Sequence, residues 1–370
     1  GEAYQRTPPA LRRPFTWLKR RLSGRVIQRL DSELFFHLLG ICSFPLKSLF
    51  GSRVTFRPGD TVVLVDSTWN SKRMLEYLFQ ARVESDIRLG AMIHDLFPLI
   101  LPETCQRETV AGFTSWFKRI APEVDFFVTN SEATSSALQR YLRDNRAIRP
   151  FACPVGSFPL GAELDLASNH RGGAANTMSI WEAPGAMVLS VGTIEPRKNY
   201  TFLLDAMDSL WGENADLSLC IIGRPGWKNE ELLKRILTHP KYAQRLFFLT
   251  DASDYALEQA FQRADCLVCC SIAEGFGLPI VEGKMHGLPV LASDIPVFRE
   301  IGGAGCSYFS LSSPDNLATQ LKKWLEKYRQ GIVRSNAQDL RWPDWKESSR
   351  LFAKVVRELG GRKIFTSPGP

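Results

Sequence analysis

From residue 60 onward the chain alternates short apolar segments with amphipathic stretches, a pattern typical of parallel β-sheets joined by crossover helices. The sequence therefore predicts an α/β protein. The segments expected to be strands are 61–66, 89–93, 125–129, 187–191, 218–222, 246–249, 266–270, 289–292 and 307–310. The last six strands suffice for a doubly wound sheet. A final amphipathic stretch at 345–359 predicts a helix that ends at Gly360.

The chain is expected to form two domains. Its 370 residues can build two separate cores. Residues 162–185 lack hydrophobic periodicity and predict a linker. An N-terminal domain is then expected at 1–161 and a C-terminal domain at 186–344, with a helix and tail at 345–370 that cross back to the first domain. No signal peptide opens the sequence and no apolar run is as long as a membrane span, so a cytoplasmic location is expected.

The positive charge of the chain is concentrated at its start. Residues 1–30 hold eight Lys or Arg side chains and a single carboxylate, so this segment alone accounts for the net charge of +7. Apolar side chains share one helical face of it, which suits an anionic membrane surface on the inner membrane face. A solvated helix packed on its own domain is the alternative. Nucleic acid is not expected as a partner, because the basic stretch lacks a recognition motif and the rest of the chain is neutral.

Three of the eight cysteines lie in one expected strand, at Cys266, Cys269 and Cys270. A Cys-x-x-Cys pair can indicate metal or redox chemistry. In an extended strand, however, Cys266 and Cys269 point to opposite faces and cannot share a metal ion. We therefore expect buried apolar cysteines.

Two carboxylates, Glu274 and Glu282, flank a glycine-containing loop after the expected strand 266–270. Pro279 fits the first turn of a helix, and Glu282 falls about one turn into it. The free N–H groups of the loop and the helix N-terminus suit a phosphate. A nucleotide sugar requires a site that binds its phosphates, with groups on both sides that accept hydrogen bonds from its hydroxyls. The two carboxylates and the loop between them meet this requirement.

This stretch resembles the E-x7-E signature of retaining glycosyltransferases of family 4, which have the GT-B fold of two Rossmann-like domains facing across a cleft. The resemblance covers about residues 60 to 350. It extends to His-Asp-Leu-Phe-Pro at 94–98, Val-Gly-Thr-Ile-Glu-Pro-Arg-Lys-Asn at 191–199, Ile-Gly-Arg-Pro-Gly-Trp at 222–227 and Leu-Pro-Val-Leu-Ala-Ser at 288–293. The variants at 94–98 and 223–227 look most like bacterial surface-polysaccharide (O-antigen) mannosyltransferases.

The resemblance implies roles for single residues. Arg197 and Lys198 would stabilise the charge of the leaving nucleoside diphosphate. Glu282 would accept hydrogen bonds from the donor ribose, and Glu274 from the donor sugar. His94 would reach across the cleft to that sugar, although a lone histidine can also be structural. The other residues expected to bind the donor, some of which could instead be ordinary turns, are Gly192, Thr193, Gly223, Arg224, Thr250, Gly275, Phe276, Gly277 and Leu278.

The activity implied is metal-independent transfer of a hexosyl group, with retention, to a glycan or lipid-linked glycan in bacterial polysaccharide synthesis. GDP-mannose is the leading donor. No Asp-x-Asp motif occurs, and the nearest pattern is Glu163-Leu164-Asp165, so neither a metal nor another cofactor is expected. The first 60 residues lack the glycine-rich start of this family. The chain is therefore expected to be a fragment of a larger protein or to have a rebuilt N-terminal half. The alternative function is a nucleotide-sugar-binding scaffold module without transferase activity.

Overall fold

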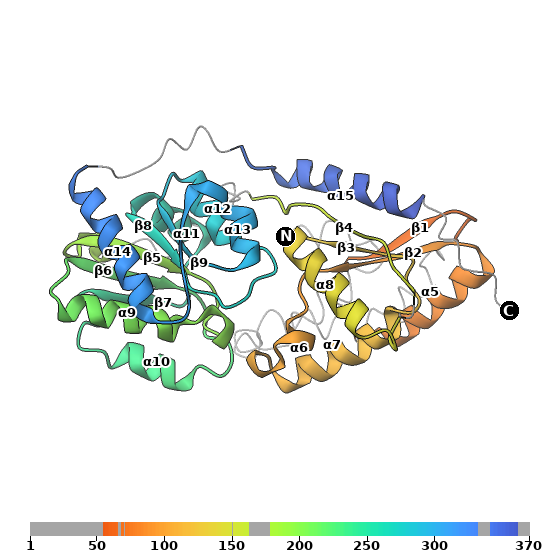
Figure 1. Ribbon diagram of the computed structural model, residues 1–370, viewed down its shortest axis with the longest axis horizontal. Coiled ribbons are helices and arrows are strands. Elements are labelled where there is room, and N and C mark those ends of the chain that lie inside the picture. Colours follow the sequence, from red (N-terminus) through yellow and green to blue (C-terminus); the bar gives the residue numbers. More distant parts are fainter. Residues whose placement is uncertain are drawn as a thin grey trace, which may run out of the picture. The chain divides into compact units, whose positions relative to one another are not determined.

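The computed structural model describes residues 55–65, 68–69, 71–149, 151–162, 178–331 and 341–361 (Figure 1). The basic segment 1–30 and Glu163-Leu164-Asp165 lie outside the described residues. Residues 57–370 form one compact unit, which contains both sheets. Within the described ranges, no helix is both long and apolar enough to span a bilayer.

The first sheet has four parallel strands in the order β1-β2-β3-β4. They are β1 (Thr61–Leu64), β2 (Arg88–Ile93), β3 (Phe126–Thr129) and β4 (Val155–Ser157). The helices of this half are α5 (Lys72–Glu84), α6 (Phe97–Ile100), α7 (Arg107–Ile120) and α8 (Glu132–Asp144), with a 3-10 turn, η1, at Pro102–Thr104. Ser131 begins α8 as its N-cap, because its hydroxyl accepts the Thr134 N–H.

The second sheet has six parallel strands in the order β10-β9-β8-β5-β6-β7. They are β5 (Ala186–Val191), β6 (Leu217–Ile222), β7 (Leu246–Leu249), β8 (Cys266–Cys269), β9 (Val290–Ser293) and β10 (Cys306–Phe309). The direction of winding reverses between β5 and β8. At such a switch point the loops that leave the two strands diverge, and open α/β sheets bind ligands there.

Helices connect the strands of the second sheet (Figure 1). They are α9 (Tyr200–Gly212), α10 (Glu230–Leu237), α11 (Asp254–Arg263), α12 (Leu278–Met285), α13 (Pro296–Gly302) and α14 (Pro314–Arg329). Shorter 3-10 turns are η3 (Met178–Glu182), η4 (Pro196–Lys198) and η5 (Gly303–Gly305).

Alternate residues of the central strands enter two separate apolar clusters. Val188 and Leu219 belong to one cluster, and Leu189 and Cys220 to the other. A strand that is buried on both faces is a nearly continuous apolar run in the sequence. The strands of the second sheet could therefore be predicted from the sequence. Cys266 and Cys269 fall in different clusters, so the prediction that they point to opposite faces of β8 is confirmed.

The last helix, α15 (Trp345–Gly360), packs against β2, β3 and β4 of the first sheet. Gly156 in β4 allows this close approach, because a Cβ there would lie 2.7 Å from Val355 and 3.1 Å from Leu359. Leu359 is 8% exposed and shares an apolar cluster with Phe126. Ser348 adds a polar contact by donating a hydrogen bond to the Pro159 carbonyl at 2.8 Å.

The structure confirms the α/β class and contains all nine expected strands. It adds β4, a three-residue strand around Gly156 that is too short and too weakly apolar to be located from its sequence. The end of the expected linker at 162–185 also differs from expectation. There η3 is a 3-10 helix, and its Ile180 is 6% exposed in the core of the second sheet.

Leu359→Ala should lower the free energy of unfolding by about 2–4 kcal/mol, because the cavity left between α15 and the first sheet cannot fully close. Urea denaturation followed by circular dichroism measures the effect. Lys354→Ala is the matched control on the same helix, since that side chain is 67% exposed. The control should change stability by less than about 0.5 kcal/mol. Equal effects of the two substitutions would show that α15 is not docked.

Candidate active site

The loops that follow β5 and β8 meet at the switch point of the second sheet. Gly192 follows β5 with φ 148°, and a Cβ on it would lie 3.2 Å from Lys198 Cε. A Cβ on Gly223, after β6, would lie only 1.9 Å from the Gly192 carbonyl oxygen. Glycine is therefore required at both positions for these backbones to pack together.

Three charged side chains form an ion cluster at this point. Lys198 Nζ lies 2.5 Å from Glu274 Oε1, and Arg197 Nη1 lies 2.6 Å from Glu274 Oε2. Ser271 Oγ donates a further hydrogen bond to Glu274 at 2.7 Å. The Arg197 guanidinium also pairs with Glu195 and lies over the Phe97 ring, 4.6 Å from its centroid. We call Arg197, Lys198 and Glu274 the ion cluster.

The ion cluster is largely shielded from water, and its charges shift one another's pKa values. Burial alone would raise the pKa of Glu274, but the Lys198 and Arg197 charges outweigh it and lower that pKa. Burial likewise opposes the charge of Arg197, yet Glu274 and Glu195 raise its pKa. Burial dominates at Glu195 and raises its pKa. Glu274 is therefore held ionised, whereas Glu195 resists ionisation more than an ordinary glutamate.

The loop between Glu274 and α12 contacts the first half of the chain. Ser131 Oγ and Thr134 Oγ1 donate to the Gly275 carbonyl at 2.7 and 3.1 Å. A Cβ on Gly275 would lie 2.3 Å from the His94 carbonyl oxygen, so only glycine fits there. The start of α8 therefore holds the Gly275 carbonyl in place, and the backbone after β2 packs against the same glycine.

The second glutamate of the pair lies in α12, whose N-cap is Gly277 at φ 109°. Burial raises the pKa of Glu282, against the opposing charge of His286. Among the described residues, no hydrogen bond or salt bridge reaches the Glu282 carboxylate. Both of its oxygens are therefore available as acceptors for a ligand.

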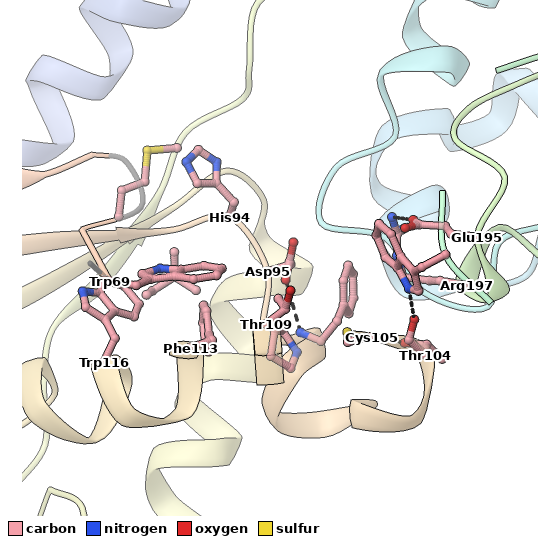
Figure 2. Close-up of a pocket in the computed structure, with 15 residues that line it drawn as sticks. Trp69, His94, Asp95, Thr104, Cys105, Thr109, Phe113, Trp116, Glu195 and Arg197 are labelled. Atoms are coloured by element: carbon pink, nitrogen blue, oxygen red, sulfur yellow. Dashed lines mark hydrogen bonds and ion pairs between the residues drawn. The ribbon is translucent and has the colours of Figure 1, made fainter. Parts of the chain in front are cut away.

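A cavity of about 230 Å³ lies beside Arg197 and Glu195. Figure 2 shows Arg197 and Glu195 on one side of Asp95, and the rings of Trp69, Phe113 and Trp116 on the other. Burial raises the pKa of Asp95, whose Oδ1 accepts the Phe97 N–H at 3.2 Å. Asp95 therefore braces its loop.

The exposed His94 also lines this cavity, with Nε2 3.2 Å from the Val65 carbonyl oxygen. Figure 2 shows it apart from Arg197, on the other side of Asp95. The structure thus places His94 at the same pocket as Arg197 but with its ring directed at the backbone after β1.

Residues 181–338 match the family described as "Glycosyl transferases group 1". They form a group 1 glycosyltransferase domain. This domain contains the ion cluster and both glutamates of the E-x7-E pair. The match begins within η3, in keeping with the packing of Ile180 on the second sheet.

The chain also resembles curated mannosyltransferases. It is 32% identical over 267 residues to the serotype-specific mannosyltransferase WbdA of Escherichia coli, covering 71% of this chain and 33% of that protein. It is 29% identical over 149 residues to the O-antigen chain mannosyltransferase RfbU of Salmonella typhimurium, covering 40% of each. The chain thus spans about a third of the length of WbdA.

Solved structures with the same fold include sucrose-phosphate synthase from Thermosynechococcus elongatus. It has a TM-score of 0.59 at 17% identity over 90% of this chain and 79% of that one. Anabaena HepE in complex with UDP and glucose has a TM-score of 0.56 at 17% identity, over 81% of this chain and 77% of that one. The GT-B fold expected from the sequence is thereby confirmed.

The glycosyltransferase domain does not bring every expected residue to the ion cluster. Phe276 is 4% exposed, so its side chain belongs to the core and only its backbone is free for a ligand. Arg224 is 81% exposed at the end of β6 and faces Asp251 at 3.8 Å. Thr193 and Thr250 are exposed after β5 and β7, and Leu278 opens α12. Apart from Phe276, these predicted residues lie at strand ends or at a helix start. Among the interactions described, none of them contacts the ion cluster.

Several residues of the site were not expected from the sequence. Glu195 was visible between Gly192 and Arg197 in a quoted motif, but nothing distinguished it from a solvated turn residue. Trp227 ends the motif at 222–227, where nothing in the sequence marks it as part of a cavity. Trp69, Phe113 and Trp116 carried no signal, because aromatic residues at such spacing are usual in a core.

Glu274→Gln should lower the free energy of unfolding at pH 7 by about 3 kcal/mol, because it leaves the shielded Lys198 without its carboxylate and Arg197 with Glu195 alone. The pKa of Glu274 is lowered in the folded protein, so its contribution is present above the unfolded value of about 4.3 and is lost as pH falls through the folded pKa. Urea denaturation at several pH values should show wild type and variant converging in acid.

Glu76→Gln is the control for this measurement. Its partner Arg119 lies 2.9 Å away, but Glu76 is 65% exposed, so the pair should contribute at most about 1 kcal/mol. If the two substitutions have the same effect at pH 7, the ion cluster does not stabilise the domain.

Proposed function

We propose that this chain is a retaining glycosyltransferase that moves a hexosyl group from a nucleoside diphosphate sugar to a glycan or lipid-linked glycan. The leading donor is GDP-mannose and the setting is synthesis of bacterial surface polysaccharide. The observation that carries the proposal is the ion cluster at the switch point of a group 1 glycosyltransferase domain. The mannosyltransferase names of its relatives support the donor sugar.

The two cations of the ion cluster suit a diphosphate. Without a ligand, Arg197 and Lys198 share the carboxylate of Glu274. Phosphate oxygens of a donor would compete for the same N–H groups, and their charge would grow as the sugar leaves. Cations already fixed in place stabilise that charge without reorganising. The N-terminus of α12 adds partial positive charge at Gly277 and Leu278.

The two glutamates suit the uncharged parts of the donor. Glu274, released in part from Lys198 and Arg197 by the diphosphate, can accept hydrogen bonds from sugar hydroxyls. The Glu282 carboxylate makes no hydrogen bond or salt bridge among the residues described, and it can accept from both ribose hydroxyls. Its partial burial would strengthen those bonds, because water competes less for the carboxylate.

Retention is proposed to follow a front-face course. The bond between sugar C1 and the diphosphate oxygen breaks, and a bond from C1 to the acceptor oxygen forms on the same face. The proton of the acceptor hydroxyl passes to the departing phosphate oxygen. Arg197 and Lys198 would balance the charge on that phosphate, in a reaction that uses no metal ion.

The enzyme is proposed to work on the cytoplasmic side of the membrane. Lipid-linked acceptors are presented at a membrane surface, and the basic segment 1–30 has the composition to bind anionic headgroups. A scaffold that binds nucleotide sugars without transferring them is the second candidate. The coverage of only about a third of WbdA favours it, because further domains of a larger protein could hold the acceptor.

The donor is identified by a thermal-shift panel of GDP, UDP, dTDP and ADP with their sugars. One nucleotide class, GDP by expectation, should raise Tm. Arg197→Ala should weaken its binding by about ten- to a hundredfold, because hydrogen bonds to charged groups contribute about 1.5–3 kcal/mol.

Arg263→Ala, at an exposed position in the last turn of α11, is the control and should bind like wild type. Absence of a shift with every nucleotide would exclude both a transferase and a nucleotide-sugar scaffold. Nucleotide binding without consumption of donor by any glycan acceptor would favour the scaffold.

Donor binding should also weaken in acid. The pKa of Glu282 is raised, so its carboxylate takes up a proton above the ordinary value of about 4.3 as pH falls, and one acceptor oxygen is then lost. Isothermal titration calorimetry from pH 7 to pH 4.5 should show this decline. Glu282→Gln should bind weakly at pH 7 and change less with pH. A variant that declines as steeply as wild type would remove Glu282 from the donor site.

A further inference from the structure

The cavity beside Arg197 has an aromatic wall built from the first half of the chain. Trp69 lies against Phe113, with ring centroids 5.4 Å apart at 88°, and against Trp116 at 6.4 Å. Phe113 and Trp116 are 6% and 5% exposed, whereas Trp69 is half-buried. The Trp69 indole is therefore the part of this wall with the most surface left for a ligand (Figure 2).

The indole N–H groups at two corners of the cavity already have partners. Trp116 Nε1 donates to Thr68 Oγ1 at 2.8 Å, and Trp227 Nε1 donates to the Thr104 carbonyl at 2.7 Å. These hydrogen bonds fix the two rings, and their N–H groups are no longer free to donate to a ligand. What Trp116 and Trp227 offer to a bound molecule is therefore apolar aromatic surface.

Two carboxylates also line the cavity, beyond the aromatic wall. Asp95 and Glu195 both line it, and both face Arg197 electrostatically. An ionised carboxylate accepts hydrogen bonds and donates none. A matching ligand needs one apolar face and several O–H donors at its edge, and a pyranose ring has this distribution, with C–H groups on its faces and hydroxyls around its rim.

Other ligand classes fit the cavity less well. An alkyl chain would strip water from Asp95 and Glu195 without replacing its hydrogen bonds. A phosphate would be repelled by the two carboxylates of Asp95 and Glu195 and attracted by only one guanidinium, that of Arg197. The volume of about 230 Å³ is below the range of about 300–1,000 Å³ typical of pockets for drug-sized ligands, which indicates one ring rather than several.

We propose that this cavity is the acceptor subsite and binds one neutral pyranose residue, whose C–H face packs on the Trp69 indole. Asp95 and Glu195 accept hydrogen bonds from its hydroxyls and so select among sugars. The inference rests on the proposed function, because a hydroxyl of this ring must reach the donor beside Arg197. The proposal also states which part of the acceptor binds in the cavity. A lipid-linked acceptor places its terminal sugar there, and its lipid lies outside the cavity.

The test is saturation-transfer difference NMR on the whole chain without nucleotide. The probes are methyl α-mannoside, methyl α-glucoside and methyl α-galactoside, with guanosine and octanol as the rival classes. At least one glycoside should show saturable transfer to its ring C–H protons. Trp69→Leu should weaken its binding by at least about tenfold, whereas Trp345→Leu, a tryptophan 47% exposed at the start of α15, should not.

Two further variants guard against misfolding of Trp69→Leu. Trp227→Leu, on the other half of the cavity, should weaken glycoside binding, and Glu195→Gln should change the preference among the three glycosides. Circular dichroism checks that each variant is folded. Transfer to guanosine or octanol in place of every glycoside, or glycoside binding unaffected by Trp69→Leu and Trp227→Leu, would overturn the inference.

This outcome is separable from that of the proposed function. If GDP or another nucleotide stabilises the protein through Arg197 but no glycoside binds, only the acceptor subsite is wrong. If glycosides bind at Trp69 but no nucleotide binds at all, the subsite stands as a sugar site and the transferase proposal fails.

Discussion

The largely shielded ion cluster of Arg197, Lys198 and Glu274 is the interaction that most constrains the second sheet. Charges removed from water must have partners close at hand, or the cost of burying them exceeds what their attraction returns. The two cations follow β5 and the carboxylate follows β8, so these strands must be neighbours although β6 and β7 lie between them in the chain. The cluster that would hold a diphosphate thus also depends on the strand order.

Much of the second domain could be predicted from the sequence because its strands are buried on both faces. The run Leu217–Ile222 is apolar except for Ser218, and all six of its residues are buried. The E-x7-E pair was equally visible, since Gly277 and Pro279 mark a helix start between its two carboxylates. The pairing of Glu274 with Lys198, 76 residues away, depends on the sheet order, which no local pattern reveals.

The first half of the site was less predictable for the same physical reason. Trp69 and Trp116 are 47 positions apart in the chain and meet because the turn after β1 lies against α7 in the folded protein. A tryptophan on a helix has the same sequence signature whether it fills a core or lines a cavity. Glu195 was hidden in another way, since burial to 4% exposure is a property of the folded chain and not of a Glu-Pro turn.

The docking of α15 on β2, β3 and β4 has a consequence for biosynthesis. A ribosome makes the four strands of the first sheet before those of the second, but the helix that covers Phe126 and Gly156 is synthesised only after all strands of the second sheet. Until then the first sheet carries an uncovered apolar face. Nascent chains would expose that surface for about 190 residues of synthesis, roughly ten to forty seconds at bacterial rates of 5–20 residues per second. The need for chaperones during translation should therefore arise from the uncovered first sheet and fall once α15 has been synthesised.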